Sequence, residues 1–486
     1  MSHFRLTILL AACPATWLSL GTAAPAQISN FKHVILMVQE NRTPDNLFQG
    51  LCSAPYGSSS SCSTTPSGSQ YDIQTSNWLN KYATSGVTQP TGEALANSYD
   101  LGHSHANFNG TCDLNSTGTC RMDGAASNIC IPNTGATCPS TPEYKYVSNP
   151  KGNLDSYLSI ATQYGWANYL VQTNQGPSFP AHQFLFGGTS APSAADDAIG
   201  TFAAENLTPA AADTQAGCIA VSTTYVDLVT TAGETTSIYP CFEHQTLADL
   251  LEAESINWKY FTLSEGSIWT APNAIDHICV PSEAYGGTCT GTEWTDNVVI
   301  GPSGVLTDIG KCTLPNLSWV IPLVKNSDHP GSNTGGGPSW VASVVNAIGN
   351  NKKCPDGETY WDNTVIIVVW DDWGGWYDHE SPTFLAAPEG DYQYGFRVPM
   401  LVVSAYTPVG YVNNQRSDFG SILRFVEQNF GIAEGALGFA DARSSTDLTD
   451  YFNLKQAPRV FTTIPAALDG EHFIHEKMPL HEIDND

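Results

Sequence analysis

The stretch TVIIVVWDDWGGWYDH at residues 364–379 decides the fold. Residues 365–369 are continuously apolar and β-branched, which is typical of a strand buried on both faces of a parallel sheet. The run stops at Asp371 and Asp372, adjacent carboxylates that repel each other unless a positive group lies beside them. In open α/β sheets the functional crevice lies beyond the carboxyl ends of the strands. This stretch therefore predicts the floor of a divalent-cation site, with a capped helix start or a solvated turn as the alternative.

A second strand ends in the same way. The apolar run at residues 31–38 is followed by Glu40 and Asn41. With Asp371 and Asp372, these residues supply three carboxylates and one amide oxygen, a ligand set suited to one divalent metal ion of unspecified identity. Asn41 also begins an N-glycosylation sequon, but the end of a buried strand is a poor exposed acceptor.

Apolar strands alternate with helical patterns along the rest of the chain. This alternation predicts βαβ units, and hence an α/β fold with a largely parallel sheet. We expect one catalytic domain over residues 27–486 with an irregular C-terminal tail from about Leu454, and a polar surface segment at 190–216. The expected strands are 31–38, 258–261, 317–321, 365–369 and 398–403, and the expected helices are 154–169, 244–254, 340–348 and 421–429.

Composition narrows the possible partners. The 486 residues carry 47 Asp and Glu against 19 Lys and Arg, a formal net charge of −28. Such a surface argues against nucleic acid and against docking on anionic membranes. An acidic protein that handles an anionic substrate needs a local positive centre, and a metal ion is the simplest one.

The N-terminus predicts export. Arg5 precedes the mostly apolar run 6–12, and small residues surround 23–26, as in a signal peptide spanning residues 1–26. Pro14 and Thr16 interrupt the run, so no integral membrane anchor is expected. The protein is predicted to be secreted or periplasmic.

The cysteines support the same compartment. Removal of the signal peptide takes Cys13 and leaves twelve of the thirteen cysteines, an even number. In an exported chain this predicts disulfides that staple long loops, with the pairing left open. No Cys/His spacing indicates a structural zinc site.

Ser178 is the leading candidate nucleophile. It lies between Gly176-Pro177 and Pro180, a rigid turn that could begin a helix whose N-terminus favours an anion. A cation beside its hydroxyl would lower the hydroxyl pKa, although such a turn can also be purely structural. Histidines in polar loops are candidates for binding a phosphoryl oxygen or protonating a leaving group, or are simple surface residues: His103, His277, His329 and His379.

Several motifs together resemble the bacterial phosphoesterase family, which includes phospholipases C and secreted acid phosphatases. The resemblance runs from about residue 31 to about residue 430. It implies the α/β/α sandwich of the alkaline phosphatase superfamily. The motifs are ENRTPDNLF at 40–48, LGHS at 101–104, GPSFP at 176–180, SDHP at 327–330, WDDWGGWYDH at 370–379 and GFRVP at 395–399.

The resemblance also implies roles for individual residues. Ser178 would be the phosphorylated nucleophile, His103 and His329 would contact the phosphoryl group, and His277 and His379 are further candidates. The metal would be held by Glu40, Asn41, Asp371 and Asp372.

The chain departs from the family pattern at two positions. Ala181 stands where the family often has Asn, which puts substrate positioning near Ser178 in question. Ala125 replaces the aromatic residue that usually follows the Met-Asp-Gly motif.

The sequence therefore predicts a secreted, metal-dependent phosphoric ester hydrolase. Its substrate would be a small phosphate ester or a phospholipid, and the choice between monoester and diester stays open, as does the oligomeric state. One alternative is a sulfatase-like hydrolase, although no sulfatase modification motif is present. The other is a catalytically silent binding protein, against which the full set of ligand-type residues argues.

Overall fold

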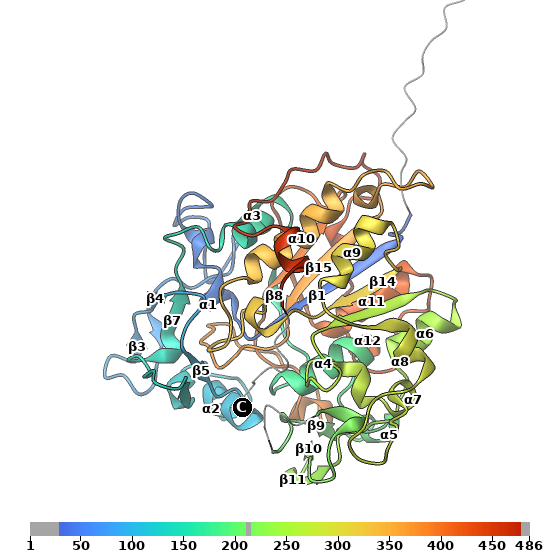
Figure 1. Cartoon of the computed structure of the whole chain (residues 1–486). Helices are drawn as coiled ribbons and strands as arrows, with labels where there is room; N and C mark the ends of the chain where they lie inside the picture. The colour runs from blue at the N-terminus through green and yellow to red at the C-terminus, as the bar shows by residue number, and fades with distance from the viewer. Residues whose placement is uncertain (1–28, 210–214, 478–486) are drawn as a thin grey trace, which may run out of the picture.

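A computed structural model describes residues 29–209 and 215–477 (Figure 1). The predicted signal peptide at 1–26, including Cys13, lies outside these residues. The central feature is an eight-stranded sheet in the order β13-β12-β14-β1-β15-β16-β8-β17. Its strands are β13 (Val298–Ile300), β12 (Trp258–Thr262), β14 (Leu317–Val320), β1 (His33–Gln39), β15 (Thr364–Trp370), β16 (Met400–Ser404), β8 (Gly165–Leu170) and β17 (Tyr411–Ser417).

The sheet is largely parallel and lies between two helical layers (Figure 1). Only the pairings of β16 with its neighbours β15 and β8 are antiparallel in this sheet. This arrangement confirms the predicted α/β class. One layer contains α3 (Asp155–Gln163), α9 (Gly304–Lys311), α10 (Gly337–Gly349) and α13 (Gly470–Ile474), and the other contains α4 (Ser178–Gly187), α6 (Leu247–Ala253), α11 (Phe419–Asn429) and α12 (Ala440–Arg443).

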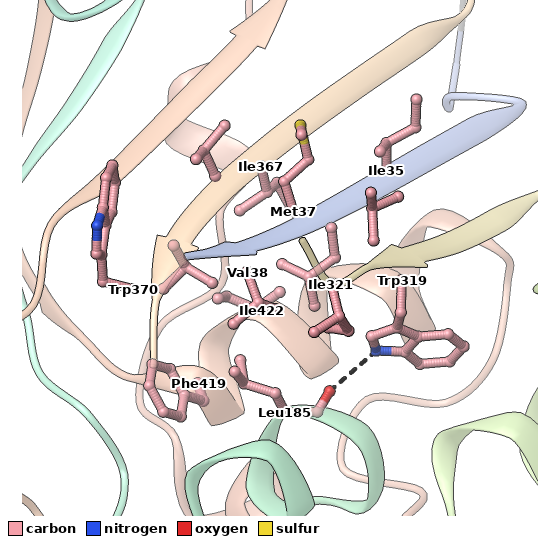
Figure 2. Close-up of a cluster of buried hydrophobic side chains, with 14 of the residues drawn as sticks. Ile35, Met37, Val38, Leu185, Trp319, Ile321, Ile367, Trp370, Phe419 and Ile422 are labelled. Carbon is pink, nitrogen blue, oxygen red and sulfur yellow. Dashed lines mark hydrogen bonds between the residues drawn. The ribbon is translucent and has the colours of Figure 1, made fainter. Parts of the chain in front are cut away.

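The core between the sheet and the second layer fixes α4 in place. Figure 2 shows Val38 of β1 packed close to Leu185 of α4 and Ile422 of α11, and all three are buried. Each such aliphatic side chain contributes about 1.5–3 kcal/mol when it is fully buried. The indole Nε1–H of Trp319 in β14 donates to the Leu185 carbonyl oxygen at 3.1 Å. The helix that begins at Ser178 is therefore anchored to the sheet.

Two sequence expectations were wrong in part. The predicted helix at 154–169 ends at Gln163, and β8 begins at Gly165, where an added Cβ would lie 2.6 Å from the Tyr451 ring. The apolar residues after Gly165 form a buried strand instead. The segment 190–216 was expected at the surface, but Ala191 and β9 (Phe202–Ala203) are buried. Small apolar side chains pack into the core even where the composition resembles a surface.

Disulfides staple the loops, as predicted. All twelve cysteines within the described ranges are paired, most of them across 8 to 10 residues. Closing such loops stabilises a fold mainly by restricting the unfolded chain. The bridges are Cys52–Cys62, Cys112–Cys120, Cys130–Cys138, Cys218–Cys241, Cys279–Cys289 and Cys312–Cys354.

The pairing makes a direct prediction for the exported protein. Alkylation of the unreduced, denatured protein should modify none of these twelve cysteines, because each sulfur is already bonded to another. Mass spectrometry of the intact protein would measure the added mass. The reduced protein serves as the control and should take up label at all of them. Extensive labelling without reduction would show that the bridges do not form.

Candidate active site

The ends of β1 and β15 bring four ligand-type side chains together. Gln39 pairs with Trp370 in the parallel register of these strands, so the residues that follow each strand meet at one edge of the sheet. The backbone N–H of Asn41 donates to Asp371 Oδ1 at 3.0 Å. The four side chains are fully buried: Glu40, Asn41, Asp371 and Asp372.

The backbone of this corner requires a glycine. Asn41 has a φ of 61°, and Gly374 has a φ of 60°. A Cβ added to Gly374 would lie only 2.4 Å from the Asn41 carbonyl oxygen. Gly374 therefore allows the loop after β15 to fold closely over the loop after β1. Asn41 is 0% exposed, which excludes the sequon as a glycosylation site in the folded protein.

Ser178 reaches the same cluster from another element. It is the first residue of α4, directly after the N-cap residue Pro177. Its Oγ lies 3.3 Å from Asp372 Oδ2 and 3.5 Å from Glu40 Oε2. The hydroxyl therefore lies at a helix N-terminus, where backbone N–H groups favour an anion, and beside carboxylates suited to a cation.

His182 belongs to the cluster and was not among the predicted site residues. Its Nε2 lies 3.1 Å from Glu40 Oε1 and 3.9 Å from Asp371 Oδ2. The available signal was its spacing, since residues i and i+4 of a helix share a face and His182 follows Ser178 by four residues. That signal depends on knowing that a helix starts at Ser178.

His103 and His329 lie at the edge of the cluster. His103 Nε2 is 2.7 Å from Asn41 Nδ2 and 3.6 Å from Asp372 Oδ2, while its Nδ1 is 2.7 Å from the Leu101 carbonyl oxygen. These contacts fit a neutral imidazole with the proton on Nδ1, which leaves the Asn41 amide oxygen to face elsewhere. The ring of His329 lies 6.4 Å from that of His103.

The structure does not bring His277 and His379 into this cluster. The ring nitrogens of His277 lie 3.0 Å from Glu243 and 3.1 Å from Asp249. Those of His379 lie 2.7 Å from Asp45 and 3.1 Å from Asp72. Both imidazoles are held by carboxylates other than the four-residue set at the strand ends.

His379 belongs to a buried ion network instead. Arg397 donates to both carboxylate oxygens of Asp378 at 3.0 Å and to Asp72 at 3.1 Å. Burial lowers the pKa of the His379 imidazole, but Asp45 and Asp72 outweigh burial and raise that pKa to about 10. The network joins helix α1 (Pro44–Leu47), which carries Asp45, to the segments that carry Asp72, Asp378 and Arg397, and we interpret it as structural.

This network predicts a pH-dependent loss of stability. An unfolded histidine has a pKa of about 6.5, so the stabilisation from His379 is complete below that pH and is lost as the pH rises toward 10. His379→Gln should lower the free energy of unfolding by about 3 kcal/mol at pH 6 and by less at pH 10. Urea unfolding at both pH values would measure this.

His277→Gln is the matched control. Hydrogen bonding to Asp249 raises the pKa of His277 to about 9, but its side chain is 29% exposed. Exposed pairs contribute only about 0–1 kcal/mol. A His379→Gln effect that is no larger than the His277→Gln effect, or that is equal at both pH values, would contradict the structural role of the network.

Comparison with known proteins identifies the family. The Phosphoesterase family model matches residues 31–433 of the chain, which include every element of the cluster. The chain belongs to the phosphoesterase family. This confirms the resemblance inferred from the motifs, and it supports a hydrolase that acts on phosphoric ester bonds.

The relatives of this phosphoesterase include phospholipases C. A non-hemolytic phospholipase C from Pseudomonas aeruginosa is 31% identical over 30% of this chain and 24% of that protein. Phospholipase C B from Mycobacterium tuberculosis is 26% identical over 32% of this chain and 33% of that protein. The chain thus matches about a quarter to a third of the length of these relatives. A solved protein in the alkaline phosphatase superfamily from Vibrio parahaemolyticus covers 62% of this chain and 66% of its own, at 11% identity and a TM-score of 0.34.

At Ala181 the chain departs from the family pattern, and another segment supplies an amide side chain nearby. Ala181 is fully buried in α4 and offers no polar side-chain atom. The side-chain oxygen of Asn206 accepts a hydrogen bond from the Phe179 N–H at 2.9 Å. An amide side chain therefore lies next to Ser178 in this phosphoesterase, supplied by the segment after β9.

The cluster fits a divalent metal ion. Potential ligand atoms of Glu40, His182 and Asp371 all lie within 4.8 Å of one another. Asn41 Oδ1 and Asp371 Oδ2 are buried and accept no hydrogen bond from the described residues. Buried oxygen atoms normally have a partner, and grouped carboxylates normally have a cation. Carboxylate, amide and imidazole donors are common ligands of divalent cations.

Proposed function

We propose that this phosphoesterase is a secreted, metal-dependent phosphoric ester hydrolase with Ser178 as its nucleophile. The observation that carries the proposal is the position of the Ser178 hydroxyl, at the start of α4 and within 3.5 Å of Glu40 and 3.3 Å of Asp372. A nucleophile has to lie beside the group that activates it. The Ser178 hydroxyl combines a helix N-terminus with two carboxylates of this cluster.

The metal is part of the proposal. Glu40, Asn41, Asp371 and Asp372 would hold it, with His182 as a further ligand or an orienting group. When bound, a divalent cation lowers the pKa of an adjacent hydroxyl and neutralises charge on phosphoryl oxygens. His103 would fix the Asn41 amide, because its Nε2 lies 2.7 Å from Asn41 Nδ2.

The chain's own residues then account for a two-step reaction. Ser178 gives its hydroxyl proton to a water molecule as its Oγ attacks phosphorus, and the bond from phosphorus to the leaving alcohol oxygen breaks. We assign His329 as the donor of the proton that this alcohol takes. Water then attacks the phosphoserine and gives one proton back to His329. The bond from Ser178 Oγ to phosphorus breaks, phosphate or a phosphomonoester leaves, and the serine oxygen takes up a proton from solvent. Positioning and charge stabilisation supply most of the catalysis in phosphoryl transfer.

The relatives favour a phospholipase C-like diesterase over a monoesterase. Both relatives described above carry the name phospholipase C. An acid phosphatase that acts on monoesters remains the second candidate, because the residues of the cluster serve both reactions. Export is supported by the six disulfides, which form in oxidising compartments. Within the described residues, none of the helices combines the length and the hydrophobicity that a membrane span requires.

A paired assay tests the proposal. The purified protein is assayed with p-nitrophenyl phosphate, a monoester, and with p-nitrophenylphosphorylcholine, a diester, before and after treatment with EDTA. We expect hydrolysis of at least one substrate, preferentially the diester, and loss of activity with EDTA that added divalent metal restores. Full activity in EDTA, with no metal found by elemental analysis, would refute metal dependence.

A further inference from the structure

We infer that Trp269 binds the substrate, and that its indole N–H donates a hydrogen bond to a phosphate oxygen of the ester. This inference rests on the proposed function and names a recognition residue for it. Trp269 lies in the segment that follows β12, at the carboxyl edge of the sheet, and it is fully buried.

The indole lies beside two histidines of the candidate active site. The ring centroid of Trp269 is 6.3 Å from that of His182, with an angle of 17° between the planes. It is 5.9 Å from the centroid of His329, with an angle of 34°. The indole therefore lies close both to the helix that carries Ser178 and to the loop that carries His329.

Both backbone polar groups of Trp269 have a partner, whereas its side-chain donor has none within the part of the chain that the structure describes. The Trp269 N–H donates to Ser267 Oγ at 3.0 Å, and its carbonyl oxygen accepts from Tyr260 Oη at 2.7 Å. The indole Nε1–H is buried and has no hydrogen-bond partner among residues 29–209 and 215–477. Because this unused donor lies in a rigidly held residue beside two histidines of the candidate active site, it suggests that the donor serves a ligand there.

The chemistry of the donor defines the ligand. The indole N–H donates and cannot accept, so it suits an oxygen atom and no cation. A buried tryptophan normally finds a partner for this group, and a phenylalanine would provide the same ring contacts without an unmet donor. The carboxylates of the cluster require a cation before an anion can bind, and a neutral donor adds recognition of the phosphate without further charge.

Trp269→Phe tests the inference, with Trp340→Phe as its matched control. Trp340 lies in α10 against Phe473, is 2% exposed, and also has a buried indole N–H without a partner in the described chain. The two substitutions therefore remove the same group from similar surroundings. Inhibition by inorganic phosphate, calorimetric titration with inorganic phosphate, and KM and kcat for both p-nitrophenyl substrates would be measured for each variant.

We expect Trp269→Phe to weaken the binding of inorganic phosphate by about 10- to 100-fold, as for a hydrogen bond to a charged group, and to raise KM. Trp340→Phe should stay within about twofold of the wild type. Trp269→His, which retains a ring N–H, should recover part of the affinity and provides the test if Trp269→Phe does not fold.

The inference would be overturned if Trp269→Phe bound inorganic phosphate as tightly as the wild type. It would also be overturned if Trp269→His and Trp269→Phe both did so. A fall in kcat with phosphate affinity unchanged would mean that Trp269 only positions the two histidines. A wild-type protein that neither hydrolyses the two substrates nor binds phosphate would overturn the proposed function and this inference together. An active wild type with an unaffected Trp269→Phe overturns this inference alone.

Discussion

Ser178→Ala should lower kcat by roughly 10³-fold or more, which corresponds to about 4 kcal/mol of lost transition-state stabilisation. The substitution removes the atom that we propose bonds to phosphorus and leaves the proposed metal ligands in place. Ser178 Oγ makes its contacts with Glu40 and Asp372 at 3.5 and 3.3 Å, so little packing is lost. The free energy of unfolding, measured by thermal unfolding, should change by no more than about 1 kcal/mol.

Ser343→Ala is the control for this substitution. Ser343 is a buried serine in α10 whose hydroxyl donates to the Trp340 carbonyl oxygen in its own helix. The variant loses the same atom in a helix on the other face of the sheet and should retain wild-type kcat. Near-wild-type turnover by a folded Ser178→Ala protein would mean that water attacks phosphorus directly.

Asp371→Asn should lower metal affinity at least about 10-fold and reduce activity in parallel. Asp371 Oδ1 is held by the Asn41 N–H at 3.0 Å, while Oδ2 is buried and accepts no hydrogen bond within the described chain. Asn keeps the shape of the side chain and removes one negative charge. Elemental analysis of the purified protein and titration of the EDTA-treated protein with divalent metal would measure the loss.

Without metal, Asp371→Asn should be more stable than the wild type. In EDTA, grouped carboxylates repel one another, so Asp371→Asn should unfold at a higher temperature than the wild type. Saturating metal should then reverse the order, because the wild type binds metal at least about 10-fold more tightly and gains about 1.4 kcal/mol or more over the variant. Asp308→Asn, which removes the partly exposed partner of Lys259, should leave metal content unchanged. Equal responses of Asp371→Asn and wild type to EDTA would contradict the metal site.

Residues that follow long buried strands were predictable from the sequence. The apolar runs at 34–38 and 365–369 favoured buried strands, and parallel strands place their carboxyl ends at one edge. That Glu40 and Asp371 meet depends on the two strands being neighbours in the sheet, which the structure shows and the strand patterns alone do not. Ser178 was predicted because Pro177 and Pro180 restrict the local backbone and Gly176 permits a turn, a pattern that marks a turn before a helix.

Other residues depend on tertiary contacts that have no local pattern. His182 enters the cluster only because α4 is packed against the sheet through Leu185. His379 was expected near Ser178, but the Gly374 turn directs the chain into the network with Asp45 instead. Trp269 lies 91 residues after Ser178 in the chain and carries no motif. Long-range packing decides each of these positions.

The most direct test of the account is to trap the covalent intermediate. Wild-type protein is mixed with substrate labelled on phosphorus, the reaction is quenched rapidly in acid, and the digested peptides are separated. The account predicts label on the peptide that contains Ser178 and none on that peptide from Ser178→Ala. Rapid turnover by the wild type with no labelled Ser178 peptide at any quench time, or label on another residue, would contradict the serine mechanism.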